Sequence, residues 1–353
     1  MQETCHGVCN SLHDRSCWCR PGSTLPTVSA LPTVDADCVA RYHLWIMTTA
    51  FIRHRECLLH DMGQHHPECP DRLHAIEDQL IASGLVGYLA EHDAPLATRG
   101  QLARVHSAEY LDALEVAVPA RGLVHLDPDT AMNPHSLQAA LRAAGAAVLA
   151  TDLVIAGEVS NAFCSVRPPG HHAERRRAMG FCFYNNVAVA AAHALEAHGL
   201  QRVAVVDFDV HHGNGTEDIF RDDARVLMVS TFQHPFYPYS GVDGRSARMV
   251  NIPLAAYSDG GKFRAAVQSA WLPALEAFAP QMIFVSAGFD AHREDDMASL
   301  ALVEADYAWV TQQIKSVAER HAQGRIVSML EGGYNLSALG RSVVAHVKVL
   351  ADL

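Results

Sequence analysis

The chain has 353 residues, 49% of them hydrophobic, which is enough apolar sequence to bury a sizeable core in one large domain or two ordinary ones. The formal net charge is −12 at pH 7, and the Lys and Arg residues are scattered apart from one compact run at Arg175–Arg177. This composition excludes an extended basic surface for nucleic acid, and no run of 18 apolar residues is present, so we expect neither a nucleic-acid nor a membrane partner.

Residues 1–46 differ in composition from the rest of the chain. The short repeat LPTVSALPTV occupies 25–34, and no helical or strand period is present. We expect a leader that is disordered or foreign to the natural protein, which would then start at Met47. The cysteine spacings in this segment lack the second matching pair of a zinc knuckle, and they indicate no disulfide framework. Because the sequence also has no secretion signal, we expect a cytoplasmic protein. The leader holds five of the nine cysteines: Cys5, Cys9, Cys17, Cys19 and Cys38.

From Met47 onward, runs rich in β-branched residues alternate with long Ala-rich stretches. The first of these runs predicts a strand directly after Met47, and residues 70–157 are predicted to be mostly helical. The alternation predicts a single α/β domain over 47–353, with a central, mostly parallel sheet flanked by helices on both faces. Further strands are predicted at 161–166, 202–209, 225–231, 281–288 and 325–330, and helices at 186–198, 262–278, 303–322 and 337–350.

Each of these five strands is followed by a polar stretch. The carboxyl ends of parallel strands meet at one edge of a sheet, and α/β proteins bind ligands at that edge. We therefore expect five segments that are distant in sequence to converge on one crevice. In chain order, they are RPPGHH, DFDVHHGNG, STFQHPFYPYSG, AGFD and EGGYN.

The second polar stretch has the residue types of a metal site. Asp207, Asp209 and His211 stand at alternate positions, so on a strand their side chains would point the same way. Polar groups on a buried strand need partners, and a bound cation can serve as one. Asp290 offers a further carboxylate, and two Asp with one His would leave the open position of a catalytic zinc-type site. The alternative interpretation is a buried hydrogen-bond network without metal.

Seven motifs in this order resemble those of the histone deacetylase superfamily, and the branch looks like class II, which includes bacterial deacetylase-like amidohydrolases. They are HHPECPDRL (65–73), VHSAEYLDAL (105–114), RPPGHH, GFCFYNN, DFDVHHGNGT, SAGFDAH and LEGGYN, and the resemblance covers residues 50–350.

The resemblance implies the arginase/deacetylase fold and two cations. One catalytic Zn²⁺ would be held by Asp209, His211 and Asp290, and would polarise the acyl carbonyl and activate a water molecule. A structural monovalent cation, K⁺, would lie near Asp207, Asp209, His211 and Ser230.

The resemblance also implies a role for the two adjacent histidines. Amide hydrolysis needs a base for the water and an acid for the leaving amine, and imidazole suits both tasks near neutral pH. His172 would be the principal acid–base group, while His171, oriented by Asp207, would act electrostatically. Asn214 would orient His172 without adding negative charge, and Tyr334 would donate a hydrogen bond to the developing oxyanion.

Four further positions correspond to substrate contacts in the family. Phe181 and Tyr237 match two aromatic walls of an acyl-lysine tunnel, with Gly180 beside them, although Tyr237 replaces the commoner Phe. Ser107 stands where some members use Asp to hold the substrate backbone.

These observations favour a metal-dependent amide hydrolase that removes acetyl or related acyl groups from lysine-like amines, and a homo-oligomer is consistent with the sequence. An acetylpolyamine amidohydrolase or an O-acyl esterase would use the same site. A binuclear manganese ureohydrolase would need additional bridging carboxylates, and a non-catalytic acyl-lysine binding module would not need Tyr334. The sequence does not identify the acyl group or the physiological substrate.

Overall fold

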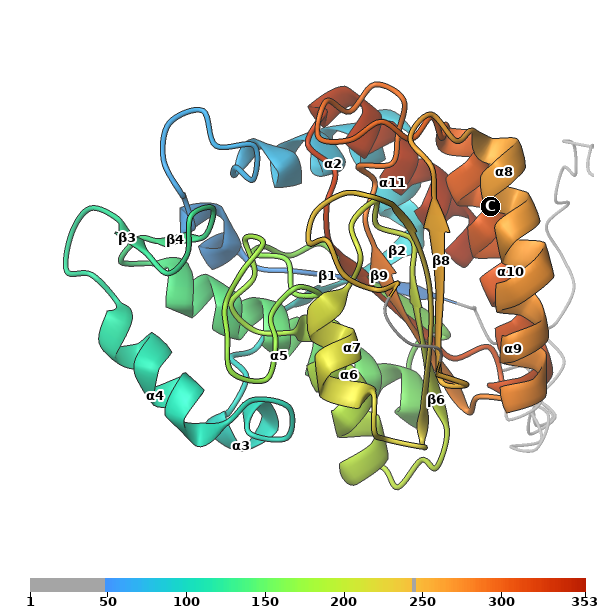
Figure 1. Ribbon diagram of the computed structural model, residues 1–353, viewed down its shortest axis with the longest axis horizontal. Helices are drawn as coiled ribbons and strands as arrows, with labels where there is room; N and C mark the ends of the chain where they lie inside the picture. The colour runs from blue at the N-terminus through green and yellow to red at the C-terminus, as the bar shows by residue number, and fades with distance from the viewer. Residues whose placement is uncertain (1–47, 243–245) are drawn as a thin grey trace, which may run out of the picture. The chain divides into compact units, whose positions relative to one another are not determined.

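The computed structural model describes residues 48–242 and 246–353, so the predicted leader at 1–46 lies outside the described residues. Eight strands form one sheet in which every neighbouring pair is parallel (Figure 1). In sheet order, the strands are β2 (Leu89–Asp93), β1 (Thr49–Arg53), β5 (Asn161–Cys164), β10 (Ile326–Leu330), β9 (Met282–Ala287), β6 (Val203–Asp207), β7 (Val226–Gln233) and β8 (Met249–Leu254).

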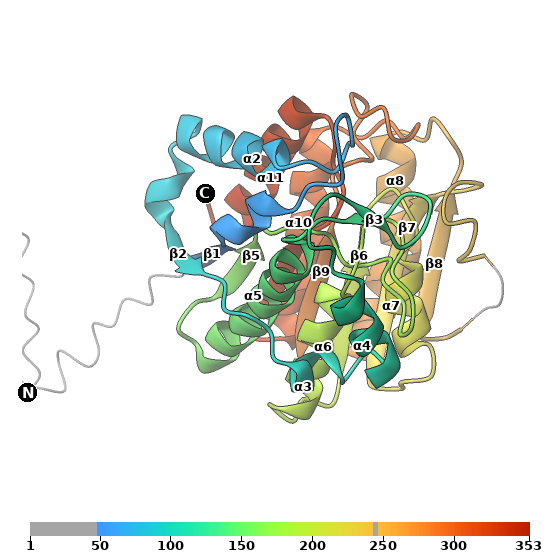
Figure 2. The ribbon, with the colours of Figure 1, turned by 90° about the vertical axis from the view of Figure 1, so that its left-hand side faces the viewer.

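Helices cover both faces of this sheet (Figures 1 and 2). On one face lie α5 (Ser136–Ala156), α6 (Asn186–Glu196) and α7 (Asn214–Phe220), and α5 packs on α6 and β5. On the other lie α2 (Asp71–Ala82), α8 (Gly260–Ala266), α9 (Leu272–Phe278), α10 (Glu304–His321) and α11 (Leu336–Leu350). The prediction of an α/β domain with a central, mostly parallel sheet between helices is confirmed.

The central strands are apolar because both faces are covered. Every residue of β5, β6, β9 and β10 is buried. The helix α5 is long and apolar enough to cross a membrane by length and composition alone, but 67% of its most apolar window is buried inside the protein. It is also packed closely at Gly145, where a Cβ would collide with the carbonyl oxygen of Pro95. These contacts are those of a core helix.

The stretch 70–157 is less helical than predicted. It contains α2, α3 (Arg99–Leu102), α4 (Ala108–Ala117) and α5, but also β2 and a hairpin of β3 (Val124–His125) with β4 (Ala131–Met132). The strand β2 has the polar sequence LAEHD because it lies at the sheet edge and is only partly buried, so it shows no apolar run. The other edge strand, β8, was not predicted because Asn251 and Pro253 interrupt its apolar residues, and only its two ends are buried.

The predicted helix at 262–278 is observed as α8 and α9 with a π-helical turn between them at Val267–Trp271. Pro273 lies just after that turn and has no N–H to donate, so regular α-helical bonding is interrupted there.

Candidate active site

The polar stretches after β5, β6, β7, β9 and β10 meet at the carboxyl edge of the sheet, as predicted. They enclose a pocket of about 270 Å³ together with the loop between β3 and β4. The pocket is lined by Asp129, His172, Gly180, Phe181, His211, Phe236, Tyr237, Met297 and Tyr334.

Asp209, His211 and Asp290 come together as a buried group at the base of this edge. One ligand atom from each lies within 4.8 Å of the other two. The Nδ1 atom of His211 lies 3.0 Å from Oδ1 of Asp209 and 3.2 Å from Oδ2 of Asp290. The structure thus brings together the three side chains that the sequence assigned to one metal.

The local backbone explains how these side chains are held. The strand β6 ends at Asp207, so the expected continuation of the strand through Asp209 and His211 is wrong. Instead, Asp207 Oδ1 accepts from the N–H of Asp209 (3.1 Å), and Asp209 Oδ1 accepts from the N–H of His211 (2.8 Å). Short acidic side chains commonly order a turn in this way.

Two glycines make room for the carboxylates. A Cβ at Gly288 would collide with the carboxylate of Asp209, and one at Gly332 would collide with that of Asp290. The N–H of Gly332 donates to Oδ2 of Asp209 (2.9 Å), so the backbone approaches the group closely. The lack of a side chain at Gly288 and Gly332 therefore leaves space for the carboxylates of Asp209 and Asp290.

The electrostatics of the group suit a divalent cation. Burial and the nearby Asp209 raise the pKa of Asp290 to about 6. Burial lowers the pKa of His211, but Asp209 and Asp290 outweigh it and raise the pKa to about 10. Oδ2 of Asp290 is buried and accepts no hydrogen bond among the described residues, although Nδ1 of His211 lies 3.2 Å away. An orphaned carboxylate oxygen beside an imidazole nitrogen and a second carboxylate is a donor set that fits zinc.

His171 and His172 lie next to this group, and each ring has its expected partner. Nδ1 of His171 is 3.0 Å from Oδ2 of Asp207, and Nδ1 of His172 is 2.8 Å from Oδ1 of Asn214. The two ring centroids are 4.0 Å apart. Asn214 in turn donates through Nδ2 to Oε1 of Glu174 (2.8 Å), which the sequence analysis did not single out.

The two rings differ in charge. Burial lowers the pKa of His171, but the carboxylates of Asp209 and Asp207 outweigh it and raise the pKa to about 10. Burial, together with the positive charge of His171, lowers the pKa of His172 well below its usual range. His172 is thus the neutral ring that can accept a proton at neutral pH.

The two asparagines of GFCFYNN hold the histidine-bearing turn in place. Asn185 caps α6 and donates through Nδ2 to the carbonyl oxygen of Ala173 (3.1 Å), while Asn186 donates to that of Pro168 (3.1 Å). Gly170 is required because a Cβ there would collide with the backbone nitrogen of Asn186.

Tyr334 lines the pocket on a loop that Asp295 fixes. Oδ2 of Asp295, a buried residue, accepts from the N–H groups of Tyr334 (2.6 Å) and Asn335 (2.9 Å). Gly333 has a φ of 119°, which favours glycine. Burial raises the pKa of Tyr334 well above its usual range, so the phenol stays protonated and can donate.

Aromatic rings form the pocket walls. The ring of Phe181 lies edge-on to that of Tyr334 at 5.9 Å, and Tyr237 lies edge-on to His172 at 5.3 Å. Gly180, with a φ of 57°, packs directly on His172, where a Cβ would collide with the ring. The N–H of Gly180 donates to Oδ1 of Asp129 (3.2 Å).

Ser107 is not among the residues that line the pocket. Its side chain caps α4 by accepting from the N–H of Tyr110 (3.2 Å), and its own N–H donates to the carbonyl oxygen of Arg175 (3.0 Å). The acidic residue in the pocket wall is Asp129, which the turn sequence LDPDT could have indicated.

Ser230 lies on β7 directly beside Asp207, as the predicted monovalent-cation site requires. Its hydroxyl oxygen is buried and has no hydrogen-bond partner in the described part of the chain. An orphaned hydroxyl next to the end of β6 fits a cation with oxygen ligands.

A second group of metal-type ligands consists of Asp152, His193 and His198. Oδ1 of Asp152 lies 2.7 Å from Nε2 of His193 and 2.6 Å from Nε2 of His198. However, Arg104 lies 2.6 Å from Nδ1 of His193 and can only donate, so the proton of His193 resides on Nε2. That nitrogen has no lone pair for a metal, and the group is a hydrogen-bond network.

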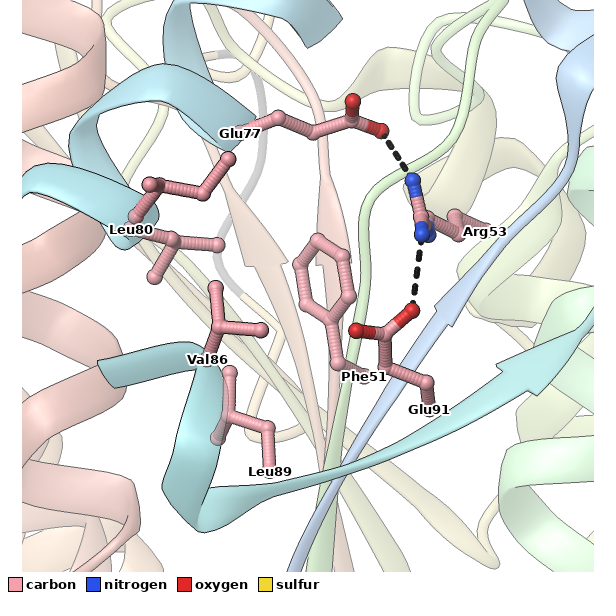
Figure 3. A pocket seen from close by; sticks show the side chains of 8 residues that line it. Phe51, Arg53, Glu77, Leu80, Val86, Leu89 and Glu91 are labelled. Atoms are coloured by element: carbon pink, nitrogen blue, oxygen red, sulfur yellow. Dashed lines mark hydrogen bonds and ion pairs between the residues drawn. The ribbon is translucent and has the colours of Figure 1, made fainter. Parts of the chain in front are cut away.

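Another hollow lies at the β1–β2 edge, beside α2, and has a volume of only about 70 Å³ (Figure 3). Its walls are mainly apolar, with Phe51 in the floor. Arg53 at its rim is held between Glu77 (2.8 Å) and Glu91 (2.7 Å). With its charges paired and no histidine or cysteine in its lining, this hollow lacks the groups for amide hydrolysis.

Comparison with known proteins gives consistent results. The sequence pattern of the histone deacetylase domain matches residues 66–350. The chain is 40% identical over 314 residues to the histone deacetylase-like amidohydrolase of Pseudomonas aeruginosa, covering 81% of this chain and 82% of that protein. It is 37% identical over 331 residues to the polyamine deacetylase HDAC10 of Mus musculus, covering 86% of this chain but 48% of that protein. The crystal structure of the HDA15 HD domain matches with a TM-score of 0.81 at 36% identity, covering 87% of this chain and 89% of that one.

Proposed function

The chain belongs to the histone deacetylase family and is a hydrolase that acts on acetylated amines, and we propose that it is a zinc-dependent deacylase of lysine-like amines. The observation that carries this proposal is the meeting of Asp209, His211 and Asp290 beside a neutral His172 at the pocket base.

In this proposal Asp209, His211 and Asp290 hold the zinc ion. When bound, zinc supplies Lewis acidity, which polarises an acyl carbonyl and lowers the pKa of water. The orphaned oxygen of Asp290 and the room left by Gly288 and Gly332 support this assignment. We likewise propose K⁺ near Ser230, Asp207, Asp209 and His211, supported by the unpartnered Ser230 hydroxyl.

The proton transfers fall to the histidine pair. His172 takes a proton from the attacking water at Nε2, because its Nδ1 is engaged by Asn214. The same ring then returns the proton to the leaving amine. His171 is held by Asp207 and carries a positive charge that helps to offset the developing negative charge.

The pocket walls set the substrate class. The rings of Phe181 and Tyr237 fit an aliphatic chain that carries the acylated nitrogen, and Tyr334 donates to the developing oxyanion. The carboxylate of Asp129 favours a substrate with additional positive charge. This feature and the similarity to a polyamine deacetylase support acetylpolyamines as the second candidate substrate.

A substrate panel on zinc-loaded protein tests the proposal. An acetyl-lysine peptide, an acetylpolyamine and an aryl acetate are compared by kcat/KM on one preparation, with Tyr334→Phe as the control for background hydrolysis. We expect the acylated amines to be hydrolysed in a Tyr334-dependent manner. Hydrolysis of the ester alone, with both amides untouched, would contradict the proposed amide chemistry.

The neutral partner of His172 leads to a pH prediction. Because the pKa of His172 is lowered, its basic form persists below pH 6.5, and kcat/KM should hold its plateau to that point. An aspartate at position 214 would lie against the carboxylate of Glu174, to which Asn214 now donates a hydrogen bond. We therefore combine Asn214→Asp with Glu174→Gln, so that the two carboxylates do not repel each other. The new charge raises the pKa of His172, and the acid limb should move up by about one pH unit or more.

The measurement is kcat/KM from pH 4.5 to 8, with Glu174→Gln alone as the control. An acid limb at the same pH in the double variant and in the control would show that His172 is not the titrating base.

A further inference from the structure

Glu331 is a fully buried carboxyl group with no arginine, lysine or histidine within ion-pair distance in the described part of the chain. It follows β10 directly. Burial raises its pKa to about 7, against the opposing effect of His171. A buried carboxyl without a cation is costly and needs other compensation.

The compensation comes from the turn that carries the catalytic histidines. Oε2 of Glu331 accepts from the N–H of Gly170 (2.6 Å) and of His171 (3.1 Å). Oε1 accepts from the hydroxyl of Ser286 on β9 (3.1 Å). One side chain therefore ties the ends of two neighbouring strands to the backbone just before His172.

The turn has little freedom on its other side. Gly170 is packed against the backbone of Asn186, and Asn185 holds the carbonyl oxygen of Ala173. Without Glu331, the N–H groups of Gly170 and His171 would be buried without acceptors, and the turn would have to shift to satisfy them.

We propose that Glu331 is a positioning residue that sets the direction of the His171–His172 pair through two backbone hydrogen bonds. This inference rests on the proposed function, since it assigns Glu331 to the same proton transfers. The hydrogen bonds carry the effect, because an acid–base group loses efficiency when it is displaced by a fraction of an ångström.

The test compares Glu331→Ala with Glu331→Gln. The amide oxygen of Gln can accept from the same two N–H groups, and its NH₂ can donate to the Ser286 hydroxyl. We expect Ala to lower kcat by about 100-fold while KM and zinc content stay unchanged. We expect Gln to retain kcat within about five-fold, since it restores the same hydrogen bonds.

Asp306→Asn is the control, because Asp306 is also a buried carboxylate that accepts from a backbone N–H, that of Val303 (3.0 Å), but it is paired with Arg264 and does not line the pocket. It should lower the melting temperature without changing kcat. Three results would overturn the proposal: full activity in Glu331→Ala, loss of zinc together with activity, or a Gln variant as impaired as Ala.

Amide hydrogen exchange of the 168–173 segment provides a second readout that needs no turnover. The N–H groups of Gly170 and His171 should exchange slowly in the wild type and in Glu331→Gln, and much faster in Glu331→Ala. Unchanged protection in Ala would overturn the positioning role. If the wild type hydrolyses no member of the substrate panel, the proposed function fails, but the exchange measurement still decides whether Glu331 holds the turn.

Discussion

Tyr334→Phe is expected to lower kcat for deacylation by about 100- to 1000-fold, while zinc content and fold stay unchanged. The variant removes one hydroxyl group from the pocket wall. Burial keeps that phenol protonated, and Asp295 fixes the backbone that carries it, so the donor is available before the oxyanion develops. Steady-state kinetics on an acylated amine, with metal analysis of the same sample, measures the effect.

Tyr237→Phe is the control for this variant, because it removes a hydroxyl from another residue that lines the same pocket. Its hydroxyl has no hydrogen-bond partner among the described residues, and we expect a change in kcat of no more than about three-fold. Undiminished turnover in Tyr334→Phe would remove Tyr334 from the chemistry.

Asp290→Asn is expected to weaken zinc binding by at least about 100-fold and to abolish measurable deacylation at limiting zinc. Asparagine can still accept from the N–H of Val210, as Oδ1 of Asp290 does (2.9 Å), so the loop should keep its course. The variant removes the charge of the carboxylate whose second oxygen is orphaned, and that oxygen lies 3.2 Å from Nδ1 of His211. Competition with a chromophoric chelator measures the zinc affinity.

Asp152→Asn is the matched control, because Asp152 belongs to the other group of three metal-type ligands. Since Arg104 fixes the proton of His193 on Nε2, we expect neither zinc content nor rate to change. Full zinc affinity in Asp290→Asn, or a loss of zinc only in Asp152→Asn, would contradict the assignment.

The sequence was most informative where burial is complete. Strands β5, β6, β7, β9 and β10 are covered on both faces, and their apolar runs were recognised as strands. The edge strands β2 and β8 have one neighbour each and are only partly buried, so neither shows the continuous apolar run of a strand covered on both faces. Their pairing depends on tertiary contacts.

Some residues of the candidate site could also be predicted from the sequence, and others could not. Asp209, His211, Asp290 and the histidine pair stand in motifs that also carry the family resemblance, and the structure brings them together. The roles of Asp295 and Asn185 were missed because each acts on backbone groups of another segment, Asp295 on N–H groups and Asn185 on a carbonyl oxygen. Such contacts leave no pattern in a single sequence.

Asp129 and Ser107 show how far a resemblance can be carried over. Ser107 matched a family position, yet its side chain is used as a helix cap. The turn sequence LDPDT could have indicated the loop that carries Asp129, but the contact of Asp129 with Gly180, which places it in the pocket wall, is tertiary.

Anomalous diffraction at the zinc absorption edge, from crystals of the zinc-loaded full chain, tests the central claim most directly. We expect one strong peak per chain within bonding distance of Asp209, His211 and Asp290. A peak confined to any other position, or side chains of these three residues refined around no scatterer at all, would contradict the account.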